Sequence, residues 1–384
     1  MTASHRLGAS ISALLLVLAT GSVRAAELHA TCATLYPSII AAKPGDVISI
    51  AAGKCETLNL YNVNKAAPGI TLQPAPGATV EIAGINLNVS DGYTFRAGPG
   101  VLEVTPWAHN GIAVAFGGSA NHFDGLTVHG GQADYTTAGG NGFMIRDATG
   151  GSITNNELYW LNTGINHLNP LNNGETILIA RNRLHDIRFD GIRGQSSKIE
   201  IRGNTLSDFY PTAGDHPDGV QFWTTGLSAP LHDITIADNV IRQGAGRPIQ
   251  GLFIGNENRQ PFHNLTITGN LVLGGMYHGL SVGWADATLV ISDNYVGGFV
   301  GNLDGAQQMV PWLMVGDSVG GKVSNNYATG WQIDGANKNT GLVLSNNHTI
   351  PLAKAGDYTM ANRWLKRATV PFAVSVAGPA AATR

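Results

Sequence analysis

Two short patterns recur together along this chain, and their period constrains the fold more than any other feature. Segments that begin with glycine and continue with an apolar residue start at Gly111, Gly142, Gly164, Gly191, Gly219, Gly251 and Gly279, at steps of 31, 22, 27, 28, 32 and 28 residues. Alternating apolar segments end in asparagine at Asn156, Asn182, Asn204, Asn239, Asn270, Asn294 and Asn326. Short alternating segments predict strands, and a period of this length is typical of a solenoid.

The repeat predicts an all-β protein, a right-handed parallel β-helix. One repeat is too small to bury its apolar face alone, so the repeats must stack around a shared core of Ile, Leu, Val and Phe. The fixed leucine spacing of leucine-rich repeats and the four strands per blade of a propeller are not visible. The 50 glycines in 384 residues fit a chain with many turns. The recurrent asparagines are expected to be structural, with side chains that hydrogen-bond along the stack.

Residues 1–25 are expected to be a secretory signal peptide. His5 and Arg6 precede an apolar run at residues 11–19, and small residues follow up to Ala25 and Ala26, which is the order found in such signals. A buried N-terminal strand or helix is the alternative. The run is too short to span a bilayer, and no later stretch suggests a membrane span. We therefore expect a secreted or periplasmic protein.

The rest of the chain is expected to form one β-helix domain, residues 26–352, followed by a C-terminal cap or tail, residues 353–384. Residues 32–42 suggest a short amphipathic helix that caps the open N-terminal end of the solenoid. Cys32 and Cys55 are the only cysteines. In an exported protein they predict a disulfide that ties the cap to the first coil; two free thiols are the alternative.

The charge of the chain argues against one class of partner. Charged residues make up 13% of the sequence and the net charge is −3. Proteins that bind nucleic acid carry a basic surplus, which this chain lacks. Nucleic acid is therefore not an expected partner.

Polar residues gather at fixed positions of the glycine repeat, and we expect them to form one outward patch. Strand side chains alternate in direction, and parallel strands lie about 4.8 Å apart, so equivalent positions of successive coils form columns. The columns comprise Asn141, Thr163, Asp190, Asp218, Gln250 and His278 before the glycines, Met144, Asn166, Arg193, Gln221, Phe253 and Ser281 after them, and Arg146, Gln195 and Trp223 further on. The loop Phe209–Asp218 feeds this patch. Ordinary Asp-Gly turn chemistry is the alternative for either aspartate.

Two segments carry a resemblance to the pectin-lyase-like superfamily of parallel β-helices. KPGDVISIAAGK, residues 43–54, resembles the first coil of β-helix alginate and chondroitin lyases, and YHGLSVG, residues 277–283, resembles a polygalacturonase segment. Tyr210, Asp215 and His216 are similar to active-site residues of β-helix mannuronan epimerases. The resemblance implies this fold and an acidic polysaccharide as substrate. The polygalacturonase aspartate pair is absent, with Gln250 in the coil between Asp218 and His278, and so is the lyases' full Lys/Arg pair with its acidic calcium cluster.

The first hypothesis is a polysaccharide lyase or epimerase that acts on a uronic-acid polymer. Such a reaction needs a cation for the C6 carboxylate, a base for the C5 proton and an acid for the leaving oxygen. Arg193 or Arg146 could bind the carboxylate, with His216 as base and Tyr210 as acid. Asp215 and Asp218 could orient His216 or hold a calcium ion, with Asp215 as the metal candidate. His278 is a further catalytic candidate, and Gln195, Gln221, Trp223 and Gln250 are expected to contact substrate.

Two other hypotheses use the same patch. A glycoside hydrolase would use Asp190 and Asp218, whose backbones would stack roughly 5 Å apart, nearer the retaining than the inverting spacing. A non-catalytic carbohydrate-binding solenoid would use Trp223, Tyr210 and Trp284 to stack on sugar rings.

Overall fold

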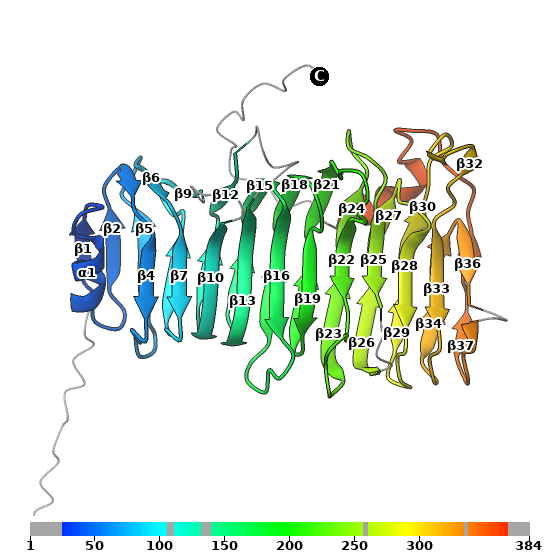
Figure 1. The fold of residues 1–384 in the computed structure, drawn as a ribbon, viewed down its shortest axis with the longest axis horizontal. Helices are drawn as coiled ribbons and strands as arrows, with labels where there is room; N and C mark the ends of the chain where they lie inside the picture. Colours follow the sequence, from blue (N-terminus) through cyan, green and yellow to red (C-terminus); the bar gives the residue numbers. More distant parts are fainter. Residues whose placement is uncertain (1–24, 106–110, 132–139, 256–259, 334–336, 368–384) are drawn as a thin grey trace, which may run out of the picture.

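The computed structural model describes residues 25–105, 111–131, 140–255, 260–333 and 337–367. Within them the chain winds as a right-handed parallel β-helix whose coils follow one another along one long axis (Figure 1). The predicted fold class is confirmed. The predicted signal peptide lies outside the described residues, apart from its last residue, Ala25.

Three parallel sheets, named A, B and C here, form the walls of the solenoid, and each full coil adds one strand to each sheet. Sheet A contains β1 (Glu27–Ala30), β2 (Val47–Ile50), β5 (Ile70–Pro74), β8 (Tyr93–Arg96), β11 (His122–Asp124), β14 (Ser152–Thr154), β17 (Ile177–Ala180), β20 (Ile199–Arg202), β23 (Leu231–Ala237), β26 (Phe262–Thr268), β29 (Val290–Ser292), β34 (Lys322–Ser324) and β37 (Val343–Ser345).

Sheet B follows sheet A in each coil. It contains β3 (Gly53–Cys55), β6 (Thr79–Ile82), β9 (Val101–Val104), β12 (Thr127–His129), β15 (Glu157–Leu161), β18 (Arg183–Ile187), β21 (Thr205–Phe209), β24 (Val240–Arg242), β27 (Leu271–Leu273), β30 (Tyr295–Gly297), β35 (Tyr327–Ala328) and β38 (His348–Thr349).

Sheet C, which runs across the middle of Figure 1, carries the glycine repeat at the start of its strands. It contains β4 (Leu58–Tyr61), β7 (Ile85–Asn88), β10 (Ile112–Ser119), β13 (Asn141–Thr149), β16 (Thr163–Asn169), β19 (Ile192–Ser196), β22 (Asp218–Phe222), β25 (Gln250–Ile254), β28 (His278–Gly283), β33 (Trp312–Gly316) and β36 (Gly330–Gln332). A small antiparallel hairpin, β31 (Leu303–Asp304) and β32 (Gln307–Gln308), precedes β33.

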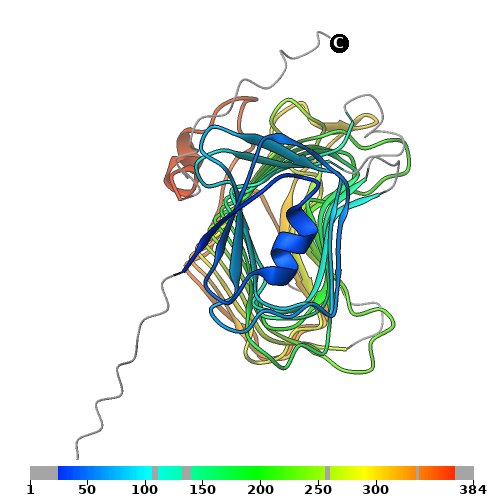
Figure 2. The same cartoon turned by 90° about the vertical axis from the view of Figure 1, so that its left-hand side faces the viewer.

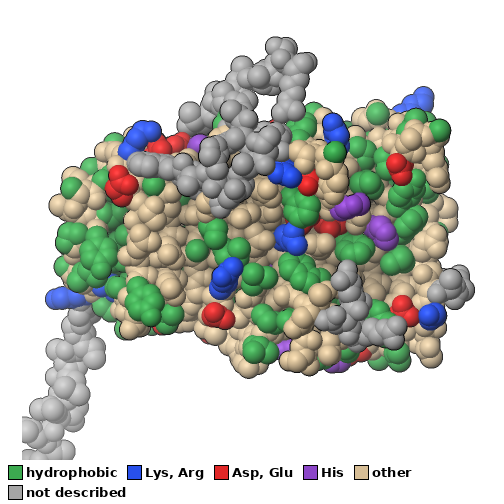
Figure 3. Space-filling model, in the orientation of Figure 1, with side chains coloured by type: hydrophobic (Ala, Val, Ile, Leu, Met, Phe, Trp, Pro, Cys, Tyr) green, Lys and Arg blue, Asp and Glu red, His purple; other side chains and the backbone are tan. Residues whose placement is uncertain are grey.

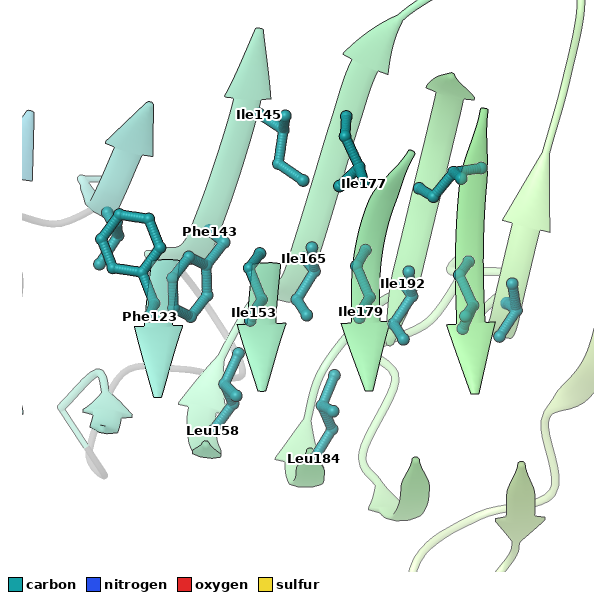
Figure 4. Close-up of a cluster of buried hydrophobic side chains, with 14 of the residues drawn as sticks. Phe123, Phe143, Ile145, Ile153, Leu158, Ile165, Ile177, Ile179, Leu184 and Ile192 are labelled. Carbon is teal, nitrogen blue, oxygen red and sulfur yellow. The ribbon is translucent and has the colours of Figure 1, made fainter. Parts of the chain in front are cut away.

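The inward side chains of the three sheets form one continuous core. Figure 4 shows rows of isoleucine and leucine with Phe123 and Phe143 beside them, all fully buried. The ring of Phe123 stacks on that of Phe95 with centroids 5.4 Å apart. Each such side chain contributes about 1.5–3 kcal/mol by leaving water, so the stack itself supplies the stability that a single coil lacks.

The recurrent asparagines form a hydrogen-bonded ladder at the corner between sheets A and B. Nδ2 of Asn182 donates to Oδ1 of Asn204 at 2.9 Å, and Nδ2 of Asn204 donates to Oδ1 of Asn239 at 2.9 Å. The same bond links every step from Asn156 to Asn347. The structural role expected for these residues is confirmed.

The N-terminal end of the solenoid is closed by a short helix, α1 (Leu35–Ala41), which lies across the opening in Figure 2. Its Leu35 and Ile39 are buried in the main core. A disulfide joins Cys32 to Cys55 on β3. Both the capping helix and the disulfide agree with the expectation from the sequence.

The described part of the C-terminal segment lies along the flank of the solenoid, outside its wall in Figure 2. It forms η2 (Thr359–Ala361) and α2 (Asn362–Leu365). Trp364 packs in a cluster with Tyr295, and its Nε1 donates to the carbonyl of Asp293 at 2.6 Å. Among the described residues, no helix is both long and apolar enough to cross a bilayer.

Candidate functional site

The glycine repeat places the polar columns because successive glycines lie in contact at the start of sheet C. A Cβ on Gly191 would lie 2.7 Å from the carbonyl oxygen of Gly219, and one on Gly219 would lie 2.8 Å from that of Gly251. Inward side chains of sheet B crowd the same positions, such as Leu206 at 2.4 Å from a Cβ on Gly191. Only glycine fits this corner, which is why it recurs.

The strand register confirms the predicted columns. Arg193 pairs with Gln221, Gln221 with Phe253, and Phe253 with Ser281. Asp218 pairs with Gln250. Figure 3 shows this face of the molecule, with Lys and Arg side chains over its middle and histidines toward its C-terminal end.

The expectation that Asp190 and Asp218 point outward was wrong. Asp190 is 1% exposed and Asp218 is 2% exposed. The chain turns the corner into sheet C at these residues, and their carboxylates lie beneath the surface. Oδ1 of Asp190 accepts the backbone N–H of Asp218 at 2.7 Å, and Oδ2 is 2.8 Å from Nη1 of Arg193. Thr163 and Ser281, expected to be outward, are also buried.

Arg193 is the central cation of the site. Its guanidinium lies over the ring of Trp223, 4.8 Å from the centroid, and over that of Phe189 at 5.2 Å. With Asp190 at one end, these rings hold the group in place while a quarter of the side chain, 25%, stays exposed. Phe189 was not among the residues singled out from the sequence.

Burial gives the two aspartates higher pKa values than exposed carboxyl groups have. Burial raises the pKa of Asp190 to about 6, although Arg193 and the N–H of Asp218 act in the opposite direction. Burial also raises the pKa of Asp218 well above its usual range, and the Asp190 carboxylate raises it further. Near neutral pH, Asp190 is thus the ionised partner of Arg193, and Asp218 keeps its proton to a higher pH than an exposed aspartate does.

The loop that enters β22, residues 210–217, carries the predicted base and acid. His216 is exposed and Tyr210 is half-buried. The backbone of Tyr210 donates to Ile187 at 2.8 Å, and Pro217 accepts from the N–H of Gln250 at 3.0 Å. The loop is therefore tied at both ends to neighbouring coils, and its polar tip faces solvent.

Asp215 is held by a guanidinium within this loop. Nε and Nη2 of Arg188 lie 3.0 and 3.2 Å from its two oxygens, and Thr212 donates to it through N and Oγ1 at 2.8 and 2.7 Å. The hydrogen bond from Arg188 is the main cause that lowers the pKa of Asp215 to about 2. Arg188, like Phe189, was missed in the sequence because only the folded corner brings it to the loop.

The predicted calcium ligand does not fit this arrangement. The oxygens of Asp215 already accept from Arg188 and Thr212, and no group of three His, Cys, Asp or Glu side chains in the described residues could hold a metal ion. A calcium site needs several free oxygen ligands. Dependence on calcium stays a prediction.

His278 lies two coils further along, in an aromatic setting. Its Nδ1 is 2.8 Å from Oγ of Ser281, and its ring meets Phe253 and Trp312 edge-on at 5.2 and 5.1 Å. Burial lowers the pKa of His278, which favours the neutral imidazole. At about 4.8 Å per coil, His278 is about 10 Å from the Asp218 coil, so it belongs to a more distant part of the same face.

The remaining predicted contact residues spread over the face. Arg146 is exposed and lies in the same column as Gln195, two coils away. Gln195 donates from Nε2 to the carbonyl of Thr225 at 2.8 Å. Gln221 has a buried Oε1 without a hydrogen-bond partner among the described residues, and Gln250 is half-buried at the start of β25.

Comparisons with known proteins agree with this architecture. A family model described as right handed beta helix region matches residues 110–296. No curated protein matches the chain. The right-handed β-helix fold implied by the resemblance to the pectin-lyase-like superfamily is confirmed.

Several solved structures are similar over most of their length. A mannuronic acid specific polysaccharide family 6 lyase from human gut microbiota shares 11% identity, with 85% of this chain and 81% of that chain covered and a TM-score of 0.48. An alginate lyase in complex with G6 shares 15%, with 87% of each chain covered and a TM-score of 0.42. A mannuronan C-5 epimerase A-module from Azotobacter vinelandii shares 13%, with 84% and 91% covered and a TM-score of 0.41. These likenesses concern the fold alone.

Proposed function

We propose that this protein is an exported enzyme that removes the C5 proton of a uronic-acid residue in an acidic polysaccharide, with β-elimination as the outcome. The observation that carries the proposal is how the charged groups divide between interior and surface. The two aspartates of the cluster are buried, whereas Arg193 on β19 and His216 in the loop that enters β22, the next strand of sheet C, are open to solvent. A face with an accessible cation and an accessible imidazole suits proton abstraction next to a carboxylate.

Each residue has a defined part in the proposed reaction. Arg193 binds the C6 carboxylate and lowers the cost of charge that develops at C5. His216 takes the C5 proton, the electron pair forms the C4–C5 double bond, and the C4–O bond breaks. Tyr210 gives its proton to the leaving oxygen. If the intermediate takes a proton back at C5 instead, the product is the epimer.

The exposed Arg146 supports a polymer with repeated negative charge. It lies two coils from the Arg193 coil on the same sheet. At about 4.8 Å per coil the two cations are about 10 Å apart along the axis. Two arginines at this spacing can bind carboxylates of separate sugar units on one chain.

The structure favours elimination over the hydrolase hypothesis. A retaining hydrolase needs one carboxylate free to attack the sugar. Asp190 is instead engaged with Arg193 and with the Asp218 backbone, and both aspartates are 2% exposed or less. A hydrolase would therefore have to open this corner before it could act.

The test is absorbance near the ultraviolet band of unsaturated uronates, measured with polymannuronate, polyguluronate, polygalacturonate and chondroitin, with and without chelator. We expect a rise on at least one polymer that His216→Ala abolishes. New reducing ends without the absorbance rise would support hydrolysis. Binding without either product would support the non-catalytic hypothesis.

A further inference from the structure

Arg188 and Asp215 form a bidentate pair that joins two successive coils beside the proposed base. Arg188 follows β18 directly, and its own N–H donates to Leu161 of the preceding coil at 3.0 Å. Its guanidinium spans both oxygens of Asp215 in the 210–217 loop, at 3.0 and 3.2 Å. Both side chains are largely covered, 20% and 13% exposed. A planar fork on two oxygens fixes orientation as well as distance.

The pair acts beside the exposed tip of the 210–217 loop. Gly214 has a positive φ of 89°, and a Cβ there would have no neighbour within 4 Å. His216 is exposed. Side-chain hydrogen bonds around the tip converge on Asp215. Its Oδ2 accepts three bonds from Arg188 and Thr212, and its Oδ1 accepts one from Arg188. Asp215 is therefore the anchor of the loop.

The same corner segment also holds Arg193. Phe189 lies against the Arg193 guanidinium and Asp190 pairs with it, so three consecutive residues serve both halves of the site. Arg188 holds the loop that carries His216, while Phe189 and Asp190 hold the cation. A shift at this corner would change the position of base and cation together, and a misplacement of about 1 Å can cost about 100-fold in rate.

We propose that Arg188 is a positioning residue, which, through Asp215, holds the 210–217 loop so that His216 and Tyr210 face the sugar bound at Arg193. The inference rests on the proposed function for its catalytic part. Its structural part, that the Arg188–Asp215 pair orders the loop, does not depend on the proposed function. In this account Asp215 is an anchor for the loop and supplies no oxygen to a metal ion.

The experiment combines kinetics with hydrogen exchange of the loop amides at residues 212–216. In Arg188→Gln we expect kcat to fall about 10- to 100-fold with KM changed less than about 3-fold. Amide exchange in the loop should rise at least about 10-fold. Arg188→Lys keeps the charge without the fork, so it should restore only part of kcat. Asp215→Asn should resemble Arg188→Gln, and the double variant should be no worse than either, because the pair acts as one unit.

Arg183→Gln is the matched control. Arg183 lies on the strand that leads to Arg188, and its Nη1 pairs with Glu157 at 2.9 Å. The substitution removes an arginine and an ion pair from the same coil, away from the loop. It should leave both kcat and loop exchange unchanged.

If hydrogen exchange of the loop amides is unchanged in Arg188→Gln, the inference is overturned, whatever the effect of the substitution on kcat. Faster exchange with wild-type kcat would show that the loop is held but that its order does not serve catalysis, which also overturns the positioning role. If the wild type processes no polymer, the proposed function fails, and loop exchange alone decides whether the pair is an anchor. If Arg188→Gln does not fold, Arg188→Lys carries the same two measurements.

Discussion

Two corners of the solenoid solve the same turning problem in opposite ways. Between sheets A and B, each coil from Asn156 to Asn347 turns with an asparagine that repeats the bonds of the one before it. Between sheets B and C a glycine also recurs, but the polar contacts beside it differ from coil to coil: Asp190 pairs with Arg193, Asp215 with Arg188, and His278 with aromatic rings. At the corner between sheets A and B, every buried polar group of the ladder is hydrogen-bonded in the same way, which stabilises the stack. At the corner between sheets B and C, the charged groups vary, and a substrate can reach some of them.

The ladder corner should give the largest effect on stability. Asn204→Ala removes the acceptor for the N–H and Nδ2 of Asn182 and the donor to Ile179 and Asn239. With unsatisfied buried groups at about 1–3 kcal/mol each, we expect a loss of about 3–6 kcal/mol in the free energy of unfolding. The urea midpoint measures it. Asn347→Ala, at the half-exposed end of the ladder, should cost clearly less; an equal cost would mean that the ladder is not a cumulative structure.

The site corner should show an asymmetry between its two aspartates. Asp190→Ala leaves the Arg193 charge without its buried partner, and we expect a loss of about 3–5 kcal/mol. Asp218→Asn replaces a carboxyl group that still keeps its proton at a pH just above the Asp190 pKa of about 6, so at that pH the loss should be below about 1 kcal/mol. Denaturant unfolding of the two variants makes the comparison, and equal losses would contradict the assignment of charge to Asp190.

The pH dependence of Asp218→Asn sharpens the same point. The pKa of Asp218 is raised in the folded protein, so the folded state binds more protons than the unfolded state above pH about 3.9, and wild-type stability falls as pH rises through that window. The Asn variant lacks this loss. Its stability relative to wild type should therefore increase from pH 4 to pH 8, and a decrease would show that Asp218 is ionised in the folded protein.

His167, a buried histidine on sheet C, should change the pH dependence of folding stability in the direction opposite to Asp218. His167 is fully buried, with no hydrogen-bond partner among the described residues for either ring nitrogen, and burial lowers its pKa to about 3. Gly194 makes room for it, because a Cβ there would lie 2.6 Å from Nδ1 of His167. The unfolded chain takes up a proton below pH about 6.5 and the folded protein does not, so wild-type stability falls as pH drops from 6.5 toward 3.

His167→Leu removes that pH-dependent loss. Its stability relative to wild type should rise by about 2 kcal/mol between pH 8 and pH 5. Unfolding curves at the two pH values measure the change. An equal difference between variant and wild type at both pH values would mean that His167 is protonated in the folded state or reaches solvent.

The sequence predicted the repeating part of the molecule well because period and composition determine it. The coils, the ladder through Asn204, the capping helix, the Cys32–Cys55 disulfide and the column from Arg193 to Ser281 all follow from spacing. Whether a side chain at a corner turns in or out depends on the path of the loop. The inward Asp190 and Asp218 were therefore mispredicted, and the partners Arg188 and Phe189 were missed.

The most direct test of the account is solvent deuterium uptake at C5 of the polymer, followed by NMR and mass spectrometry in D₂O with the best substrate of the ultraviolet panel. The wild type should either eliminate across C4–C5 or return deuterium to C5. His216→Ala should lose both by about 100- to 10,000-fold while it still binds the polymer. Proton abstraction that persists at the wild-type rate in His216→Ala would place the base elsewhere and contradict the account of the sheet B–sheet C corner.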